Sequence, residues 1–272
     1  MRGWSHVVLT LAIWAAWGNF AAAQQTIVNV PSDALTPRGQ AFYLHESQAL
    51  PWTDGADFNT TNFLCYGLSD HTELCLTSYG VDNAGSPDGA LGFGFKSVYQ
   101  VFEERWPKLE MKLTYGFMAP VSHGVQDDAI GYFPYAHMSF EIPETDVRLL
   151  VGGAAGSENL FGRQEASILA GLEIPITDHF SFTGEWFSGH HNLSGLIPGF
   201  TYHKGRWIVV TGYKIPNNFE MRNSALIFEA GLFFGPGAGK HHDEGDHGGE
   251  HDSAAPERPG NIYRHYGTRP PR

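Results

Sequence analysis

Charged residues are scarce in this 272-residue chain, and cations are scarcer than anions. Asp, Glu, Lys and Arg make up 17% of the sequence, with 17 Lys and Arg against 29 Asp and Glu, so the formal net charge is -12. Nucleic acids are bound through clustered Lys and Arg, which neutralise the phosphate backbone. The acidic balance therefore excludes nucleic acid as the expected partner.

Long hydrophobic runs are also missing, which excludes a helical membrane protein. A membrane-spanning helix needs about 20 apolar residues, and the best candidate, residues 7–17, is much shorter. It follows Arg2 and precedes Ala21-Ala22-Ala23. A charged start, an apolar centre and small residues at the end are typical of a secretory signal peptide. We expect residues 1–23 to be a signal peptide that is removed.

Cysteine occurs only twice, as Cys65 and Cys75. An exported chain enters an oxidising compartment, where two cysteines can pair. They lie five residues on either side of Asp70, which is central to a Ser-Asp-His-Thr turn sequence. This symmetry predicts a disulfide across a hairpin, provided that the two Cα atoms come within disulfide range. We expect it to have a structural role and no catalytic one.

Glycine and aromatic residues are abundant, and apolar residues recur at every second position. The sequence holds 33 Gly and 14% aromatic residues. In residues 109–117 apolar side chains alternate with Glu110, Lys112, Thr114 and Gly116. Such a period of two predicts β-strands. We expect 12 strands, at residues 40–48, 61–68, 73–81, 90–99, 108–118, 131–142, 147–156, 165–175, 179–188, 196–203, 206–214 and 224–234.

The connections between these strands alternate in length. Short turns are expected near residues 69–72, 106–107, 143–146, 177–178 and 204–205, and longer links at 49–60, 82–89, 119–130, 157–164, 189–195 and 215–223. Short turns on one rim and long loops on the other are typical of outer-membrane barrels, as is an even strand number. The expected fold is therefore all-β, an antiparallel transmembrane β-barrel whose apolar faces meet lipid.

The last expected strand carries a more specific mark. Leu226, Phe228, Ala230, Leu232 and Phe234 alternate with inward-facing positions and end in an aromatic residue. This strand resembles the terminal strand of bacterial outer-membrane proteins, which the outer-membrane assembly machinery recognises. With the signal and the strand rhythm, residues 38–234 resemble the porin-like outer-membrane β-barrel proteins. The resemblance implies a bacterial outer-membrane location, contact with its lipid, and either passage of small solutes or a structural role.

The expected organisation has four parts. A signal peptide at 1–23 precedes a periplasmic N-terminal segment at 24–37, the β-barrel at 38–234 and a flexible tail rich in His, Asp and Glu at 235–272. An even number of strands places both termini in the periplasm.

Charged residues on the faces opposite the apolar ones should line the lumen. In a wide barrel they would face water and favour cations, whereas in a narrow one they would pair and fill the space. Twelve strands lie between these cases, so a channel, a structural ion-pair network and a specific binding site all remain open. The expected lumen residues are Lys96, Glu110, Lys112, His137, Glu141, Arg148, Glu173, Glu185 and Glu229.

Histidine is concentrated in the tail. His241, His242, His247 and His251 stand among five carboxylates, a donor set that suits a divalent transition metal such as zinc, nickel or copper. A solvated low-complexity tail that binds metal only incidentally is the alternative. The pair His190-His191 falls in an expected external loop, where adjacent histidines are usually ordinary surface residues.

No nucleophile elbow or metalloprotease motif occurs, so we expect no enzyme and no required cofactor. Three functions stay open at this point. The first is an outer-membrane channel for small solutes or ions, and the second is a metal-capturing or partner-binding barrel that acts through its tail. The third is a secreted soluble β-sandwich, which would bury the apolar faces between two sheets.

Overall fold

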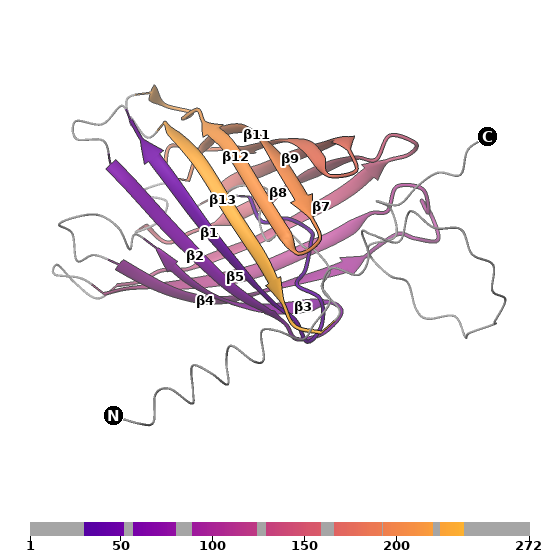
Figure 1. The fold of residues 1–272 in the computed structure, drawn as a ribbon, viewed down its shortest axis with the longest axis horizontal. Helices are drawn as coiled ribbons and strands as arrows, with labels where there is room; N and C mark the ends of the chain where they lie inside the picture. The colour runs from indigo at the N-terminus through magenta and orange to yellow at the C-terminus, as the bar shows by residue number, and fades with distance from the viewer. Residues whose placement is uncertain are drawn as a thin grey trace.

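Twelve long antiparallel strands close into a barrel in the computed structural model (Figure 1), which describes residues 30–51, 57–79, 89–123, 129–158, 166–191, 193–219 and 224–236. A two-residue strand, β6 (Ala129–Ile130), pairs with one end of β5. The long strands are β1 (Ala41–Leu50), β2 (Asp57–Gly67), β3 (Thr72–Tyr79), β4 (Gly89–Gln100), β5 (Lys112–His123), β7 (Phe133–Ile142), β8 (Val147–Ala155), β9 (Ala166–Thr177), β10 (Phe180–Phe187), β11 (Gly195–Lys204), β12 (Trp207–Lys214) and β13 (Ala225–Phe234).

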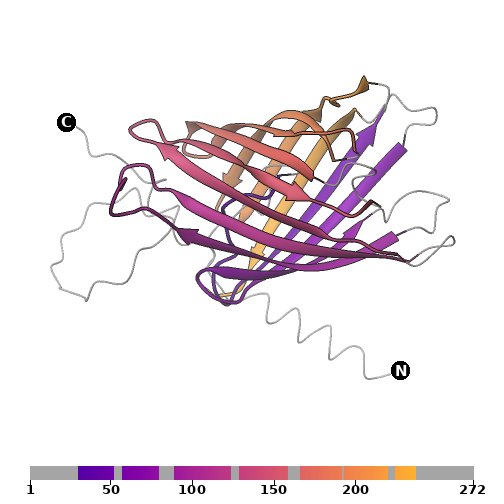
Figure 2. The same ribbon diagram turned by 180° about the vertical axis from the view of Figure 1, so that it is seen from behind.

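Each long strand pairs with its neighbours in the chain, and the ring closes between the first and the last strand. β1 pairs with β13 from Ala41↔Phe234 to Ala49↔Leu226, and β4 pairs with β5 over twelve positions. Figure 2, which shows the barrel from behind, displays the magenta and orange strands that complete the opposite wall. The predicted antiparallel barrel is confirmed, and the soluble β-sandwich is wrong because the strands form one closed sheet.

Two strands differ from their predicted ranges by four residues or more, and the other boundaries agree within two. β2 begins four residues earlier, at Asp57, because polar residues such as Asn59 pair with β1 through the backbone ladder alone. β5 begins at Lys112 and runs to His123, whereas the sequence pattern placed it at 108–118. Residues 101–111 form one longer connection, in which Glu110 adopts a positive φ of 42°. That conformation is incompatible with an extended strand.

Alternate side chains along each strand lie on the outer and on the inner surface of the barrel. Leu76 on β3 is 60% exposed and Leu91 on β4 is 71% exposed, whereas Glu73 and Lys96 on the inward positions of these strands are buried. Exposed aromatic side chains also gather near the rim formed by the short turns, as girdles do at a membrane interface. They include Tyr66, Tyr99, Tyr115, Tyr202 and Trp207.

The interior is not only polar. A buried apolar cluster lies on the inner faces of β11, β12, β13 and β1, although the pattern directed apolar residues outward. Phe42 stacks on Phe233 in this cluster, with ring centroids 4.2 Å apart. Its members are Phe42, Leu44, Ile197, Ile208, Val210, Ala225, Ile227 and Phe233. Part of the lumen is therefore packed like a protein core.

Residues 30–37, which we call the plug segment, lie inside the barrel. The segment precedes β1, and Val30, Asp33 and Thr36 are almost fully buried. Its contacts described below reach β3, β5, β7, β8 and β10. The expectation that residues 24–37 form a periplasmic segment is therefore wrong for 30–37, because charged groups in the lumen bind this part of the chain.

Cys65 and Cys75 are joined by a disulfide in the structure. They are cross-strand partners in the β2–β3 hairpin, with Cα atoms 4.1 Å apart. Both sulfurs lie on the inner face.

Among the described residues, no helix has the length and apolar character needed to cross a membrane.

Candidate functional site

The candidate site is the inner surface of the barrel, where the strand register brings the charged residues together. Eight of the nine residues predicted to line the lumen occupy inward positions: Lys96, Lys112, His137, Glu141, Arg148, Glu173, Glu185 and Glu229. The exception is Glu110, which lies in the connection after β4. The structure adds Asp33, Glu46, Glu73 and Lys214, which sequence reasoning did not select.

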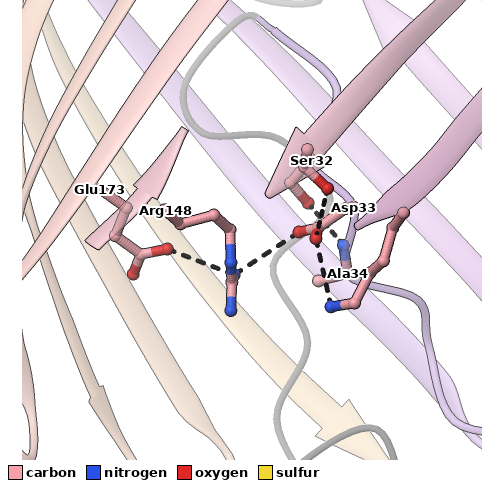
Figure 3. Close-up of polar contacts among 7 residues, drawn as sticks. Ser32, Asp33, Ala34, Arg148 and Glu173 are labelled. Carbon is pink, nitrogen blue, oxygen red and sulfur yellow. Dashed lines mark hydrogen bonds and ion pairs between the residues drawn. The ribbon is translucent and has the colours of Figure 1, made fainter. Parts of the chain in front are cut away.

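Asp33 of the plug segment is the centre of a group of ion pairs (Figure 3). Its Oδ2 atom lies 3.2 Å from Lys112 Nζ on β5 and accepts a hydrogen bond of 2.8 Å from the Ser139 hydroxyl on β7. Its Oδ1 atom lies 3.5 Å from Arg148 Nη1 on β8. The same nitrogen lies 3.4 Å from Glu173 Oε2 on β9. Three strands thus hold one carboxylate of the plug, and Glu173 on a fourth strand holds Arg148.

The electrostatic surroundings keep Asp33 ionised. Burial alone would raise the pKa of its carboxyl group, but the adjacent charges of Arg148 and Lys112 and the Ser139 hydrogen bond outweigh it and hold the pKa well below its usual range. A buried charge that has several partners is tolerated, whereas the same charge alone would be costly. The group therefore fixes the plug as an anion against the cations of the wall.

Two backbone N–H groups of the plug bind carboxylates on other strands. The Thr36 N–H donates to Glu73 Oε2 on β3 at 2.7 Å, and Glu73 Oε1 lies 3.1 Å from Lys96 Nζ on β4. The Val30 N–H donates to Glu185 Oε2 on β10 at 2.8 Å. These contacts give acceptors to two backbone N–H groups that lie outside the strand ladders. Opposite walls of the barrel thus hold the two ends of the segment.

Apolar packing completes the seat of the plug. Val30 is fully buried in a second apolar cluster, together with Leu150, Ala154, Leu169 and Phe187. A cavity of about 30 Å³ remains between the plug and the wall, bordered by Asp33, Arg148, Gly171 and Thr183 among others. This volume suffices for a water-sized guest, since one water needs roughly 10–15 Å³ on this measure.

A second set of charges occupies the wall from β10 to β1. Glu46 and Glu229 are cross-strand partners on β1 and β13, and both are buried. Lys214 on β12 interacts electrostatically with Glu46 and Glu185, and Glu229 with the same two carboxylates. The Gln48 amide donates to Glu46. Neither oxygen of Glu229 has a hydrogen-bond partner within the described part of the chain.

Bulky neighbours fill the space above several inward glycines. A Cβ on Gly231 would lie 2.6 Å from the Phe42 ring, and one on Gly152 would lie 2.4 Å from His137 Cβ. Atoms of the adjacent strands thus occupy the space that a side chain at these positions would need.

His191 is buried, contrary to the expectation of a surface histidine. Its Nε2 atom lies 2.9 Å from the Ser167 hydroxyl and 3.0 Å from the carbonyl oxygen of Ser188. A ring nitrogen that donates to a carbonyl cannot at the same time accept the proton of a serine, so this pair does not resemble an activated nucleophile. Burial lowers the pKa of His191 to about 4. The residue anchors the β10–β11 loop to the barrel.

The tail histidines His241, His242, His247 and His251 lie outside the described residues, as does the expected signal peptide. Metal binding by the tail therefore stays a prediction.

Comparison with known proteins gives structural likeness only. No protein-family model matches the chain, and no curated protein matches it. A solved KdgM porin in complex with disordered oligogalacturonate is 9% identical, with a TM-score of 0.49, and the match covers 72% of this chain and 98% of that one. The outer membrane protein Omp33 of Acinetobacter baumannii is 8% identical, with a TM-score of 0.43 over 72% of this chain and 98% of that one.

An outer membrane channel from Pseudomonas putida F1 is 12% identical, with a TM-score of 0.42, and the match covers 74% of this chain and 97% of that one. The function of the barrel is therefore inferred from its own residues.

Proposed function

We propose that the chain is a porin-like channel protein of the bacterial outer membrane, for small solutes or ions, whose own plug segment narrows the lumen. The observation that carries this proposal is the contrast between an apolar outer surface and a buried, charged inner one. Leu76 and Leu91 project outward while Glu73 and Lys96 of the same strands pair inside. A closed ring of this kind satisfies every backbone group of a spanning segment without water.

The outer surface favours lipid as the surrounding medium. Among the twelve long strands that the structure describes, the closed ladder leaves no free edge. Exposed aromatic side chains near the short turns fit an interfacial girdle, with Tyr99 stacked on Tyr115 at a centroid distance of 6.1 Å. We further propose that β13, which ends in Phe234, is the strand that the assembly machinery recognises. The described ends of the barrel lie together, since the Gln40 amide donates to the Pro236 carbonyl at 3.1 Å.

The plug segment sets the expected conductance. It enters the lumen from the short-turn rim and is held by Asp33, Thr36 and Val30. Ion pairs and the apolar clusters fill much of the rest, so the ion-pair network that the sequence left open is part of the same structure. We propose that the unmodified protein conducts weakly and that displacing the plug widens the path.

Planar-bilayer recording tests this function. The purified chain is compared with a variant in which residues 30–37 are replaced by a Gly/Ser sequence of equal length. We expect small conductance steps from the original chain and larger steps from the variant, because the replacement lacks the Asp33 carboxylate and the Val30 side chain. Absence of conductance from both proteins, each migrating as a heat-modifiable folded barrel, would refute the channel and leave the fold intact.

A further inference from the structure

The wall presents to Asp33 a set of donors that would suit any small carboxylate. The two oxygens of Asp33 contact Lys112 Nζ at 3.2 Å, the Ser139 hydroxyl at 2.8 Å and Arg148 Nη1 at 3.5 Å. Two cations and one hydroxyl donor from three neighbouring strands, β5, β7 and β8, thus converge on one carboxylate group. Charge-assisted contacts of this kind are the stronger ones by which proteins recognise carboxylates.

The carboxylate that occupies this position comes from outside the sheet. The plug segment precedes β1 and is not part of any of the strands. Asp33 can therefore leave the wall without breaking the ladder that closes the barrel, while Lys112, Ser139 and Arg148 stay in place. Lys112 then loses the carboxylate that lies 3.2 Å from its Nζ atom. An uncompensated buried charge is costly, so an anion from solution would be stabilised at the same position.

Space for the rest of a small solute adjoins the Asp33 carboxylate. The cavity of about 30 Å³ borders Asp33, Arg148, Glu173 and Thr183, and Figure 3 shows Arg148 between Asp33 and Glu173. Thr183 is 1% exposed, and its hydroxyl has no hydrogen-bond partner within the described ranges. A buried polar group without a partner often marks a bound molecule. The Thr183 hydroxyl is therefore a further donor for a solute that extends into the cavity.

We propose that Lys112, Arg148 and Ser139 form a binding site for the carboxylate of a small organic acid, and that Asp33 occupies this site as an internal substitute. The inference deepens the proposed channel function and rests on it, because it names organic acids as the solutes that the lumen binds once the plug is displaced. Asp33 is tethered to the barrel, and tethering gives a group a high effective concentration. A dilute solute therefore enters the site only when the plug segment has left it.

Two carboxylates of the wall limit the charge of the solute. Glu173 Oε2 lies 3.4 Å from Arg148 Nη1, and Glu141 is the cross-strand partner of Arg148 on β7. A solute with one carboxylate replaces the single charge of Asp33. A second carboxylate on the solute would be repelled by Glu173 and Glu141, since like charges that are brought together are unfavourable. The site therefore favours monocarboxylic acids, for which acetate is the simplest probe.

Calorimetric titration with sodium acetate tests the site on the full chain in detergent, with sodium chloride at equal concentration as the reference. Asp33→Ala removes the internal carboxylate. Glu229→Gln is the matched control, because it removes a different buried carboxylate of the lumen and keeps Asp33. We expect Asp33→Ala to bind one acetate on the order of 10-fold more tightly than the original chain and Glu229→Gln do, because only there is the carboxylate position open to a hydrogen-bonded anion.

Adding Lys112→Gln to Asp33→Ala should remove most of this gain, because a cation of the site is lost. Heat-modifiable migration checks the folding of each variant, and if Asp33→Ala does not fold, the Gly/Ser replacement of residues 30–37 takes its place in the titration. Equal acetate affinity in Asp33→Ala and the original chain, or a gain that survives Lys112→Gln, would overturn the proposal. The titration needs no conductance, so failure of the channel and failure of the site are distinguishable.

Discussion

The two groups of buried carboxylates in this barrel differ in how completely they are paired. Asp33 has two cations and a hydroxyl within 3.5 Å, and Glu73 has Lys96 and a backbone N–H. Glu229 has no hydrogen-bond partner from the described residues and faces two further carboxylates. A satisfied group rigidifies the structure, whereas an unsatisfied one invites a ligand. The first group therefore holds the plug, whereas Glu229 lies in the wall without such a contact in the described part of the chain.

Breaking the ion pairs of Asp33 should have the largest effect, which is to displace the plug segment. Asp33→Asn leaves Lys112 and Arg148 near a neutral amide, and removing one partner of a buried pair typically costs roughly 3–5 kcal/mol. We expect the plug to leave the lumen in most molecules. A membrane-impermeant maleimide should then label Cys at Ser32→Cys much faster than it does with Asp33 intact. Unchanged labelling would mean that the apolar contacts of Val30 alone seat the plug.

A paired comparison of two isosteric substitutions sharpens the contrast. Glu73→Gln leaves Lys96 buried without its counter-charge and should destabilise the barrel by roughly 3–5 kcal/mol. Glu229→Gln removes a buried carboxylate whose oxygens have no hydrogen-bond partner among the described residues, so it should be neutral or stabilising. Urea unfolding of both variants in lipid vesicles measures the difference. A similar loss of stability in the two would contradict the distinction between the groups.

Packing rather than charge pairing holds the wall beside Glu229, and a glycine substitution tests this. Gly231→Ala places a Cβ 2.6 Å from the Phe42 ring and should cost about 1–3 kcal/mol through overpacking. Gly153→Ala is the control, because its nearest contact would be 3.4 Å. Adding Phe42→Leu to Gly231→Ala should recover part of the loss. The same unfolding assay reports all three variants.

The smallest expected effect is a pH dependence confined to the β10–β11 loop. Burial lowers the pKa of His191 to about 4 from 6.5, so between these values the opened loop binds a proton that the closed loop does not. Loop stability is full above pH 6.5 and is lost as the pH falls toward 4. The protection factors of amide hydrogens near Ser188, which correct for the slower intrinsic exchange at low pH, should therefore fall on acidification. The plug should not respond in this window, because Asp33 stays ionised.

The period of two in the sequence was enough to predict the barrel and most of its inward residues. Lys96, Glu185 and Glu229 each lie next to an outward apolar residue, namely Phe95, Trp186 and Phe228, and a closed sheet gives them one possible direction. The prediction that Glu110 lines the lumen was wrong, because a positive φ at this residue ends the regular alternation before β5. Backbone conformation of that kind leaves no trace in a pattern of polar and apolar residues.

Other members of the site could not be predicted from local pattern. Glu46 follows Phe42 and Leu44 on the same face of β1, and these apolar residues point inward into a packed cluster, so hydrophobicity suggested the wrong direction. Asp33 lies in a segment without any periodicity. Its place depends on Lys112, Ser139 and Arg148, which are more than 75 residues away in sequence and become neighbours only when the ring closes.

The seam between β1 and β13 has a consequence for how the protein is made. Because the first strand finds its second partner only in the last one, the sheet keeps two exposed edges until synthesis has passed Phe234. A chain that stops before β13 would retain these edges and aggregate or be degraded. Conversely, joining residues 40 and 235 and opening a long loop should yield a circularly permuted barrel, since the ends to be linked are already adjacent.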